Sequence, residues 1–443
     1  MFENLLDYHQ PRSRDPFERV AGKMVCSVNV IYPVHAQDIT DKAMISFKNH
    51  TIMPRYVDRQ YDKLWGQSGA KRGTTINLRY PPQYELRRGD HAEPQGSNES
   101  FFPVTMGEPV GVDLDFTSQE LLLTVDDFMN RFIKPATLPI ANACDSDLAG
   151  LYKYIFNYVG TPGTIPATIE TYLNATSALA SAGAPVEGDE WSMIIDYKSN
   201  AKIINALAGQ YNPQGTISRQ WDSARMVSAA GYKWSQDQNI RMHTVGALGG
   251  TPIVAGVGQS GASINIDGCG AAAVTRYWGE GDVIQFAGVY GIKPQSVPLN
   301  GVGESTGDLM NFRITADINL GAGPGTITAL IDPPIILTGA TQNVTNAPGD
   351  NVAVTTFGHA SAYAGVVTRQ NMAFQKSALV LGNIDLPLPG GMDMAARTTD
   401  EDTKLSMRFL RGFDITENVY ISRLDMLYVV ACPRPQFGCR VVG

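Results

Sequence analysis

Three glycines in the stretch 251–261, TPIVAGVGQSG, are the first feature of this sequence that could do chemistry. An apolar run precedes Gly256, Gly258 and Gly261, which have the G-x-G-x-x-G spacing of a dinucleotide-binding loop. That site needs a following helix, because the helix N-terminus holds the pyrophosphate. Here the next residues, ASINIDGCG, alternate like a strand and have no helix cap or helical period. We therefore predict a glycine-rich turn between two strands, with no nucleotide and no other cofactor bound.

A second motif has the spacing of a serine nucleophile. GESTG, Gly303–Gly307, matches G-x-S-x-G, which in hydrolases needs a buried strand before it and a helix after it. Pro298 and Asn300 precede the motif, and the strand-like segment NFRITADINL follows it. The sequence therefore predicts that Ser305 is a loop serine without a catalytic role.

The titratable side chains give no clear metal or catalytic site. The six histidines form no H-x-x-x-H pair and no Cys/His cluster, so no metal is expected. The five cysteines lack C-x-x-C spacing, which favours free thiols. A carboxylate pair for glycoside hydrolysis stays an alternative, because sequence spacing alone cannot establish one. The carboxylate groups, interpreted as a helix start and two solvated loops, are Asp126–Asp127, Asp400–Glu401–Asp402 and Glu187–Asp189–Glu190.

Composition narrows the class of protein. The 443 residues are 43% hydrophobic and 18% charged, which is typical of a folded chain with a sizeable core. The net charge of −8 and the lack of a basic stripe argue against sequence-specific nucleic-acid binding. No apolar run reaches the ~20 residues of a membrane helix, and the N-terminus has no apolar signal region. We expect neither a membrane partner nor secretion.

The first 160 residues divide into three predicted elements. Residues 1–50 mix charges and prolines, which indicates an extended arm that packs on something else. Residues 74–117 are predicted to form a long hairpin, because TTINLRY and GVDLDFT alternate on either side of a polar loop. Apolar residues at helical spacing then predict one long helix over 125–160, which Pro135 and Pro139 must kink or interrupt.

The rest of the chain alternates between mixed and all-β segments. Helices are expected at Ser199–Tyr211, Thr216–Val227 and Ser361–Ser377, and a strand at Val419–Val430. Residues 245–357 hold 20 of the 44 glycines and only eleven charged residues, and show no helical period. Recurring short strands between glycine turns favour an antiparallel barrel or sandwich inserted in an α+β body. Its strands are predicted at Ser263–Ile266, Asp282–Tyr290, Asn311–Asn319, Thr326–Ile331 and Val352–Thr356.

Several of these segments resemble one protein family. GDVIQFAGVYGI, at 281–292, resembles a strand of the β-domain inserted in coat proteins of the Salmonella-type short-tailed phages, and residues 311–337 resemble the paired strands that follow it. VTMGEPVGVDLDF, at 104–116, is similar to the Met-Gly-Glu-Pro segment before that family's spine helix. DYKSNAKIINAL and GTISRQWDSARMV resemble its axial-domain helices. The matches follow the family's order from about residue 70 to 440. Between Gly246 and Gly279 this chain is shorter, where the family carries a projecting loop that contacts the neighbouring capsomer.

The resemblance implies an α+β chain with the capsid shell fold of tailed phages and herpesviruses. That fold has an N-arm, an extended loop, a peripheral domain with a spine helix, and an axial domain, here with an inserted antiparallel β-barrel domain. The expected limits are the N-terminal arm 1–50, the extended-loop region 51–124, the spine helix 125–160, the axial domain 161–244, the β-barrel domain 245–357 and the axial and peripheral return 358–443.

The implied function is that of a major capsid protein, not an enzyme. It would self-assemble as hexamers and pentamers into an icosahedral shell around double-stranded DNA, which it would enclose without specific binding. Expected partners are further copies of itself, a scaffolding protein, a portal protein and a decoration protein, in the virion and in the host cytoplasm during assembly. Two alternatives stay open: a polysaccharide-acting enzyme with an inserted β-module, and a phage tail or receptor-binding subunit.

The predicted contact residues between subunits lie in the polar stretch 79–103. Such a loop cannot bury enough apolar surface by itself to offset an ordering entropy of about 1–2 kcal/mol per residue. We expect it to be mobile in the free subunit and ordered against a neighbour in the shell, where Phe101 and Phe102 contribute more than any exposed ion pair. The candidates are Arg79, Arg87, Arg88, Asp90, Glu93, Glu99, Phe101 and Phe102.

Overall fold

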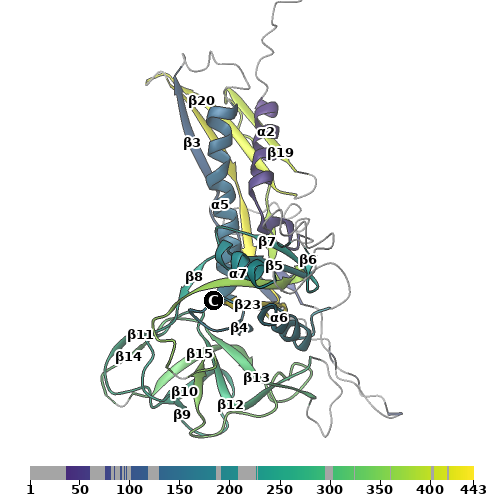
Figure 1. Ribbon diagram of the computed structural model, residues 1–443. Coiled ribbons are helices and arrows are strands. Elements are labelled where there is room, and N and C mark those ends of the chain that lie inside the picture. Colours follow the sequence, from purple (N-terminus) through teal and green to yellow (C-terminus); the bar gives the residue numbers. More distant parts are fainter. Residues whose placement is uncertain are drawn as a thin grey trace, which may run out of the picture.

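The computed structural model describes residues 36–59, 75–80, 101–117, 129–185, 191–207, 228–294, 303–323, 325–359, 361–400, 404–416 and 419–443, with Met226 and a few single positions between 84 and 96. The molecule is elongated (Figure 1). A body of helices and sheets forms one end, and a barrel-like group of strands forms the other.

A four-stranded antiparallel sheet forms the far end of the body. Its strand order is β19-β20-β21-β3. Two helices, α2 (Ala36–His50) and α5 (Lys134–Gly150), pack side by side on one of its faces. The strands are β3 (Val110–Thr117), β19 (Met394–Thr399), β20 (Ser406–Asp414) and β21 (Val419–Met426).

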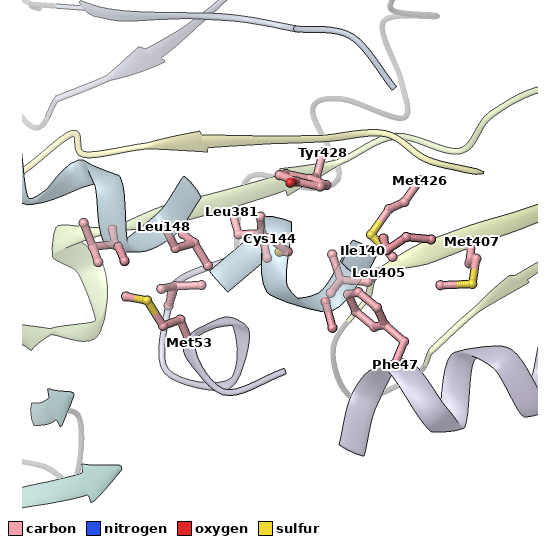
Figure 2. Close-up of a cluster of buried hydrophobic side chains, with 14 of the residues drawn as sticks. Phe47, Met53, Ile140, Cys144, Leu148, Leu381, Leu405, Met407, Met426 and Tyr428 are labelled. Carbon is pink, nitrogen blue, oxygen red and sulfur yellow. The ribbon is translucent and has the colours of Figure 1, made fainter. Parts of the chain in front are cut away.

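The core of the body lies between these helices and the strands. Ile140, Cys144 and Leu148 recur at helical spacing along α5 and are fully buried. Figure 2 shows them beside Phe47 of α2 and Met407 of β20. The apolar stripe of each helix therefore fixes which side faces the sheet.

The predicted arm is wrong for its last part. Residues 36–50 form α2, in which Ile39, Ala43 and Phe47 are buried at helical spacing. That stripe favours a helix, and the surrounding charges and prolines obscured it. Residues 1–35 lie outside the described residues, including the strand-like stretch at 24–32.

The predicted long helix is partly corrected. Helical structure runs through a π-helical turn (Met129–Ile133), α5 and a 3-10 turn, η4 (Leu151–Tyr154), and the predicted start before residue 129 lies outside the described residues. The chain then becomes extended and forms β4 (Tyr158–Gly160), so the helix does not reach Gly160. Pro135 directly follows the π-helical turn, and α5 continues past Pro139 without interruption.

A second sheet joins the body to the barrel. Its strand order is β4-β23-β17-β5-β7-β6, with β8 pairing with the start of β17. Alternate residues of β5 face two different cores, since Ile194 packs with α5 while Met193 and Ile195 pack with α6 (Ile169–Ser181) and α7 (Tyr197–Leu207). The strands are β5 (Trp191–Ile195), β6 (Ser228–Ala229), β7 (Tyr232–Gln236), β8 (Met242–Thr244), β17 (Val367–Gln375) and β23 (Gly438–Val442).

Predicted helices in this region had mixed outcomes. The helix expected from Ser199 is α7, which begins at Tyr197 and is described to Leu207. The helix expected at 361–377 is wrong: this segment contains β17, a central strand that is buried on both faces. A strand buried on both faces loses its two-residue period, so pattern alone cannot separate it from a buried helix. The helix expected at 216–227 lies almost wholly outside the described residues.

Residues 245–357 contain an antiparallel barrel-like sheet with its own core. The strand order is β16-β12-β13-β15-β10-β9, and a bridge between Ile253 and Ala353 links the two ends, so the sheet nearly closes. All five predicted strands are present, although the one expected at 311–319 divides between β13 and β14. The bounds are β9 (Ile253–Val254), β10 (Gly261–Asp267), β11 (Val274–Trp278), β12 (Val283–Ile292), β13 (Ser305–Ile314), β14 (Ile318–Leu320), β15 (Ile327–Ile335) and β16 (Val354–Thr356).

The two enzyme-like motifs lie in this sheet. The G-x-G-x-x-G stretch is a turn between β9 and β10, as predicted, and Gly256, Gly258 and Gly261 have positive φ angles of 100°, 73° and 90°. The glycines therefore serve the turn geometry. The G-x-S-x-G stretch differs from the predicted loop, because Ser305 is already the first residue of β13. A strand follows it, not the helix that a nucleophile elbow needs.

The hairpin predicted over 74–117 is present, but its second strand is 101–105 and not 111–117. β1 (Thr75–Arg79) pairs with β2 (Phe101–Thr105), whereas β3 pairs with β21, about 300 residues later. We call β1 and β2 together the ribbon. It packs near a two-stranded sheet of β18 (Val380–Asn383) and β22 (Tyr428–Ala431). The strand predicted at 419–430 is present as β21 and β22, with a break at Leu427.

Candidate assembly surfaces

The ribbon has one face anchored on its own subunit and one face exposed. Leu78 and Val104 are buried against Leu427 and Ala431, and Phe102 packs beside them. Successive residues of a strand point to opposite faces, so Phe101 projects on the other side, where its side chain is 51% exposed. The ribbon is thus held by one face and presents the other.

The predicted contact residues are divided by this geometry. Arg79 and Phe101 are cross-strand partners in the ribbon, and Asp90 is exposed in the connection between the two strands. The two phenylalanines, expected to act together, lie on opposite faces because they are adjacent in β2. Arg87, Arg88, Glu93 and Glu99 lie outside the described residues.

The four-stranded sheet has a charged outer face, turned away from α2 and α5. The carboxylate of Asp425 is fully buried and accepts hydrogen bonds from Arg408 and Arg423, both at 2.6 Å. Arg423 also lies 3.6 Å from Asp113 of the neighbouring strand β3. Gly111 is required here, because a Cβ atom would lie 2.5 Å from the Asp425 Oδ1 atom and would also collide with the Leu424 carbonyl oxygen. This network ties β3, which follows the ribbon in the chain, to β20 and β21.

A buried polar cluster joins the barrel-like sheet to the body. His243 Nε2 lies 2.8 Å from Asp282 Oδ1, and both side chains are almost completely buried. The other oxygen of Asp282 accepts backbone hydrogen bonds from Gly246 at 2.9 Å and Gly279 at 2.7 Å. One carboxylate therefore binds the backbone at both ends of residues 246–279, the stretch that contains β9, β10 and β11.

Arg440 completes this junction from the last strand of the chain. Its Nη1 atom donates to the Gly281 carbonyl at 2.8 Å, and its guanidinium lies 5.9 Å from the Tyr152 ring centre and 5.8 Å from that of Phe357. Burial lowers the pKa of Arg440 to about 10. Tyr152 also contacts His243, with its hydroxyl 3.2 Å from Nδ1. The end of the spine helix, the entry to the barrel-like sheet and the C-terminal strand thus meet at one point.

Sequence reasoning did not find these junction residues. Asp282 was predicted only as the first residue of a strand, and its partner His243 is 39 positions earlier. Arg440 contacts Gly281 across 159 positions. No local spacing marks residues that meet only after the sheets assemble. Within the described ranges, no cluster of three or more His, Cys, Asp or Glu side chains is arranged for a metal. No described helix is both long and apolar enough for a membrane span.

Comparison with known proteins decides the family. The family described as "P22 coat protein - gene protein 5" matches residues 35–443. This chain belongs to the P22 coat protein family. It is therefore the coat protein, or major capsid protein, of a tailed phage, with a structural role in a self-assembled shell and a place in the virion capsid. The enzyme and tail-subunit alternatives find no support.

The coat protein is also similar, at low identity, to several solved structures. Similar chains come from Mycobacterium phage Che8 (8% identity, 88% of this chain and 90% of that chain, TM-score 0.42) and the capsid of cyanophage P-SCSP1u (9%, 84% and 89%, TM-score 0.37). Another is the virus-like particle of Pyrococcus furiosus (7%, 91% and 97%, TM-score 0.35). All three TM-scores lie below 0.5, so the assignment rests on the family match. No protein with curated annotation matches the coat protein.

Proposed function

We propose that this coat protein forms hexamers and pentamers of an icosahedral shell that encloses double-stranded DNA. The family match over residues 35–443 is the observation that carries the proposal. The elongated subunit, with a ribbon that exposes one face, suits tiling, because exposed apolar groups can be buried only against another copy. The proposal includes a non-catalytic role throughout the chain.

We further propose its partners and the limits of its parts. A scaffolding protein, a portal protein and a decoration protein would meet this shell, and assembly would take place in the host cytoplasm. The six segments are proposed as its domains with two changed limits: residues 36–50 (α2) belong to the body and not to the arm, and the spine helix ends at Tyr154. The separate core within 245–357 supports the inserted domain, and the junction at Asp282 supports its limits.

The ribbon is the proposed contact with a neighbouring subunit. Phe101 lies on its exposed face beside Arg79, whereas Phe102 is already packed on its own subunit. An exposed ion pair contributes about 0–1 kcal/mol, so burial of the Phe101 ring is the stronger driving force. The contact should form only in the shell.

Electron microscopy of the expressed protein, alone and with the phage's scaffolding protein, tests the proposal. We expect closed particles in which clusters of six and five subunits are visible. Filaments or stable monomers under all conditions would contradict the proposed shell. Release of reducing sugar from polysaccharides by the purified chain would instead support the enzyme alternative.

A further inference from the structure

The outward surface of α2 and α5, here called the helix face, combines cations with exposed apolar side chains. Ile45 of α2 is 60% exposed and Leu138 of α5 is 40% exposed, although both helices bury their other sides in the core. Lys134 lies exposed one turn before Leu138 and Arg131 two turns before it, and Lys42 lies exposed one turn before Ile45. The helix face therefore has exposed apolar side chains and more cations than carboxylates, since Asp38, one turn before Lys42, is the exposed carboxylate among the residues at this spacing.

These residues lie next to one another because the two helices run in the same direction. The hydroxyl groups of Ser46 and Thr137 are 2.9 Å apart, and the Ile52 backbone N–H donates to Asp145 at 3.1 Å. This register places Ile45 beside Leu138, and Lys42 beside the turn with Arg131 and Lys134.

The two surfaces of this part of the subunit differ in how their cations are paired. On the opposite side, Arg408 and Arg423 of the sheet both form ion pairs with Asp425. Among the described residues, no carboxylate forms an ion pair with Arg131 or Lys134. The helix face thus offers positive charge to an acidic and apolar partner.

One segment of this same chain has the complementary pattern. In MFENLLDYH, at 1–9, Phe2, Leu5 and Leu6 recur at helical spacing, and Glu3 and Asp7 lie four positions apart. A helix of this pattern would set an apolar stripe against Ile45 and Leu138, with its two carboxylates within reach of the cations.

The route of the chain favours the segment of a neighbouring copy. α2 begins at the end of the elongated body that lies farthest from the barrel-like sheet (Figure 1). In a closed shell, other subunits lie beyond that end. The 27 residues between Tyr8 and Ala36 can span up to roughly 90 Å when extended, which is enough to cross to the next subunit.

We propose that residues 2–8 of one coat protein bind the helix face of a neighbouring copy in the shell. Phe2, Leu5 and Leu6 cover Ile45 and Leu138, while Glu3 and Asp7 pair with Arg131 and Lys134. The inference rests on the proposed function, because it needs an assembled shell. This contact is distinct from the one proposed for the ribbon, because it is made by the N-terminal segment and the helix face.

A photo-crosslinking amino acid at position 138 tests the contact. Particles are assembled from equal parts of ¹⁵N-labelled and unlabelled subunits, irradiated, digested and analysed by mass spectrometry. We expect cross-links from position 138 to residues 2–8 that join labelled to unlabelled peptides. The same amino acid at position 421, where Ile421 is 49% exposed on the outer face of the sheet, is the matched control and should not capture this segment.

Charge exchange supplies the second arm. Glu3→Lys with Asp7→Lys should abolish the cross-link, Arg131→Glu with Lys134→Glu should do the same, and all four changes together should restore it. All four side chains are exposed or lie outside the described residues, so unassembled subunits should keep the wild-type unfolding midpoint. If the two double variants lost the cross-link only because they fold poorly, combining them in the fourfold variant would not restore it.

Other outcomes overturn the inference. Cross-links from position 138 only to DNA, only to the scaffolding protein, or only within one subunit would each show a different occupant. Well-formed particles with no cross-link to residues 2–8 would refute this contact and leave the proposed shell intact. Absence of particles from the unmodified chain would instead refute the proposed function, and with it the setting of the contact.

Discussion

Two buried carboxylates in the body, those of Asp425 and Asp145, constrain the residues around them. Gly111 is adjacent to the buried Asp425 carboxylate, and Asp145 is a buried carboxylate in the middle of α5. Neither residue has a partner nearby in the sequence. Substitution of either residue should change the free energy of unfolding of the free subunit, which can be measured.

Gly111→Ala should destabilise the subunit by about 1–3 kcal/mol, because the new methyl group collides with the Leu424 carbonyl and the Asp425 carboxylate. Urea unfolding followed by circular dichroism measures the change. Gly107→Ala is the matched control, since nothing lies within 4 Å of a Cβ atom there. Equal midpoints for the two variants would contradict the crowding at Gly111.

Asp145 should make the subunit less stable as pH rises. Burial raises its pKa to about 7, against the effect of hydrogen bonds from the Ile52 and Met53 backbone. The folded state therefore holds this proton more tightly than the unfolded state, whose carboxyl has a pKa near 4. The stabilisation is complete below pH ~4 and is lost as pH rises through about 7, at up to about 1.4 kcal/mol per pH unit.

Asp145→Asn removes this titration and keeps an acceptor oxygen for the loop after α2. Unfolding free energies measured from pH 5 to 7.5 should fall more steeply for the wild type than for the variant. Parallel pH profiles would show that Asp145 is ionised in the folded protein throughout this range.

At the scale of elements, the two faces of the ribbon have different surroundings. The face with Leu78, Val104 and Phe102 holds the ribbon on its own subunit. The face with Phe101 is half exposed, and we propose that a neighbouring subunit covers it. The alternation of a strand makes this separation unavoidable for two adjacent phenylalanines.

Phe101→Ala and Phe102→Ala should therefore have different effects. Phe102→Ala should lower the stability of the free subunit by about 1–3 kcal/mol, less than a fully buried phenylalanine, because its ring is only partly buried. Phe101→Ala should lower that stability less than Phe102→Ala does and should reduce the yield of particles. Calorimetry of subunits and light scattering of assembly distinguish the two, and a reversed pattern would refute the assignment of the faces.

At the scale of the whole molecule, the barrel-like sheet and the body have separate cores that meet at a polar junction. The barrel core includes Trp278, Phe286 and Phe312, all fully buried. The junction holds the two parts through His243, Asp282 and charged Arg440. Because it has a core of its own, the barrel-like sheet should fold independently, and the junction should hold it in a fixed position on the body.

The segment 245–357, extended by up to ten residues at each end, should fold by itself. Its own hydrophobic core and its nearly closed sheet leave few strand edges open. The purified segment should give a β-type circular dichroism spectrum and a cooperative thermal transition. A disordered or helical spectrum would contradict an independent domain.

His243→Ala should weaken the attachment of the barrel-like sheet. It removes one hydrogen-bond partner of a buried carboxylate, a change that typically costs about 1–3 kcal/mol. Limited proteolysis should then cut near residue 245 faster than in the wild type. His359→Ala, at an exposed position, is the control and should leave the cleavage rate unchanged.

Features that depend on neighbours in the chain could be predicted from the amino-acid sequence. The strands between glycine turns in 245–357, the turn with Gly256, Gly258 and Gly261, and the helix beginning near Ser199 were predictable because periodicity and φ preference act locally. The quoted segments also indicated the family. Four of the eight predicted contact residues lie outside the described residues, and their role stays a prediction.

Tertiary structure alone decided which elements pair and which side chains meet. β3 pairs with β21 rather than with β1, and β17 is a central strand, because the free energy of pairing depends on surfaces supplied by distant parts of the chain. The Asp282 carboxylate finds its partners only when the body and the barrel-like sheet come together. Asp282 becomes buried only when these two parts pack together, so no pattern of neighbouring residues predicts its role at the junction.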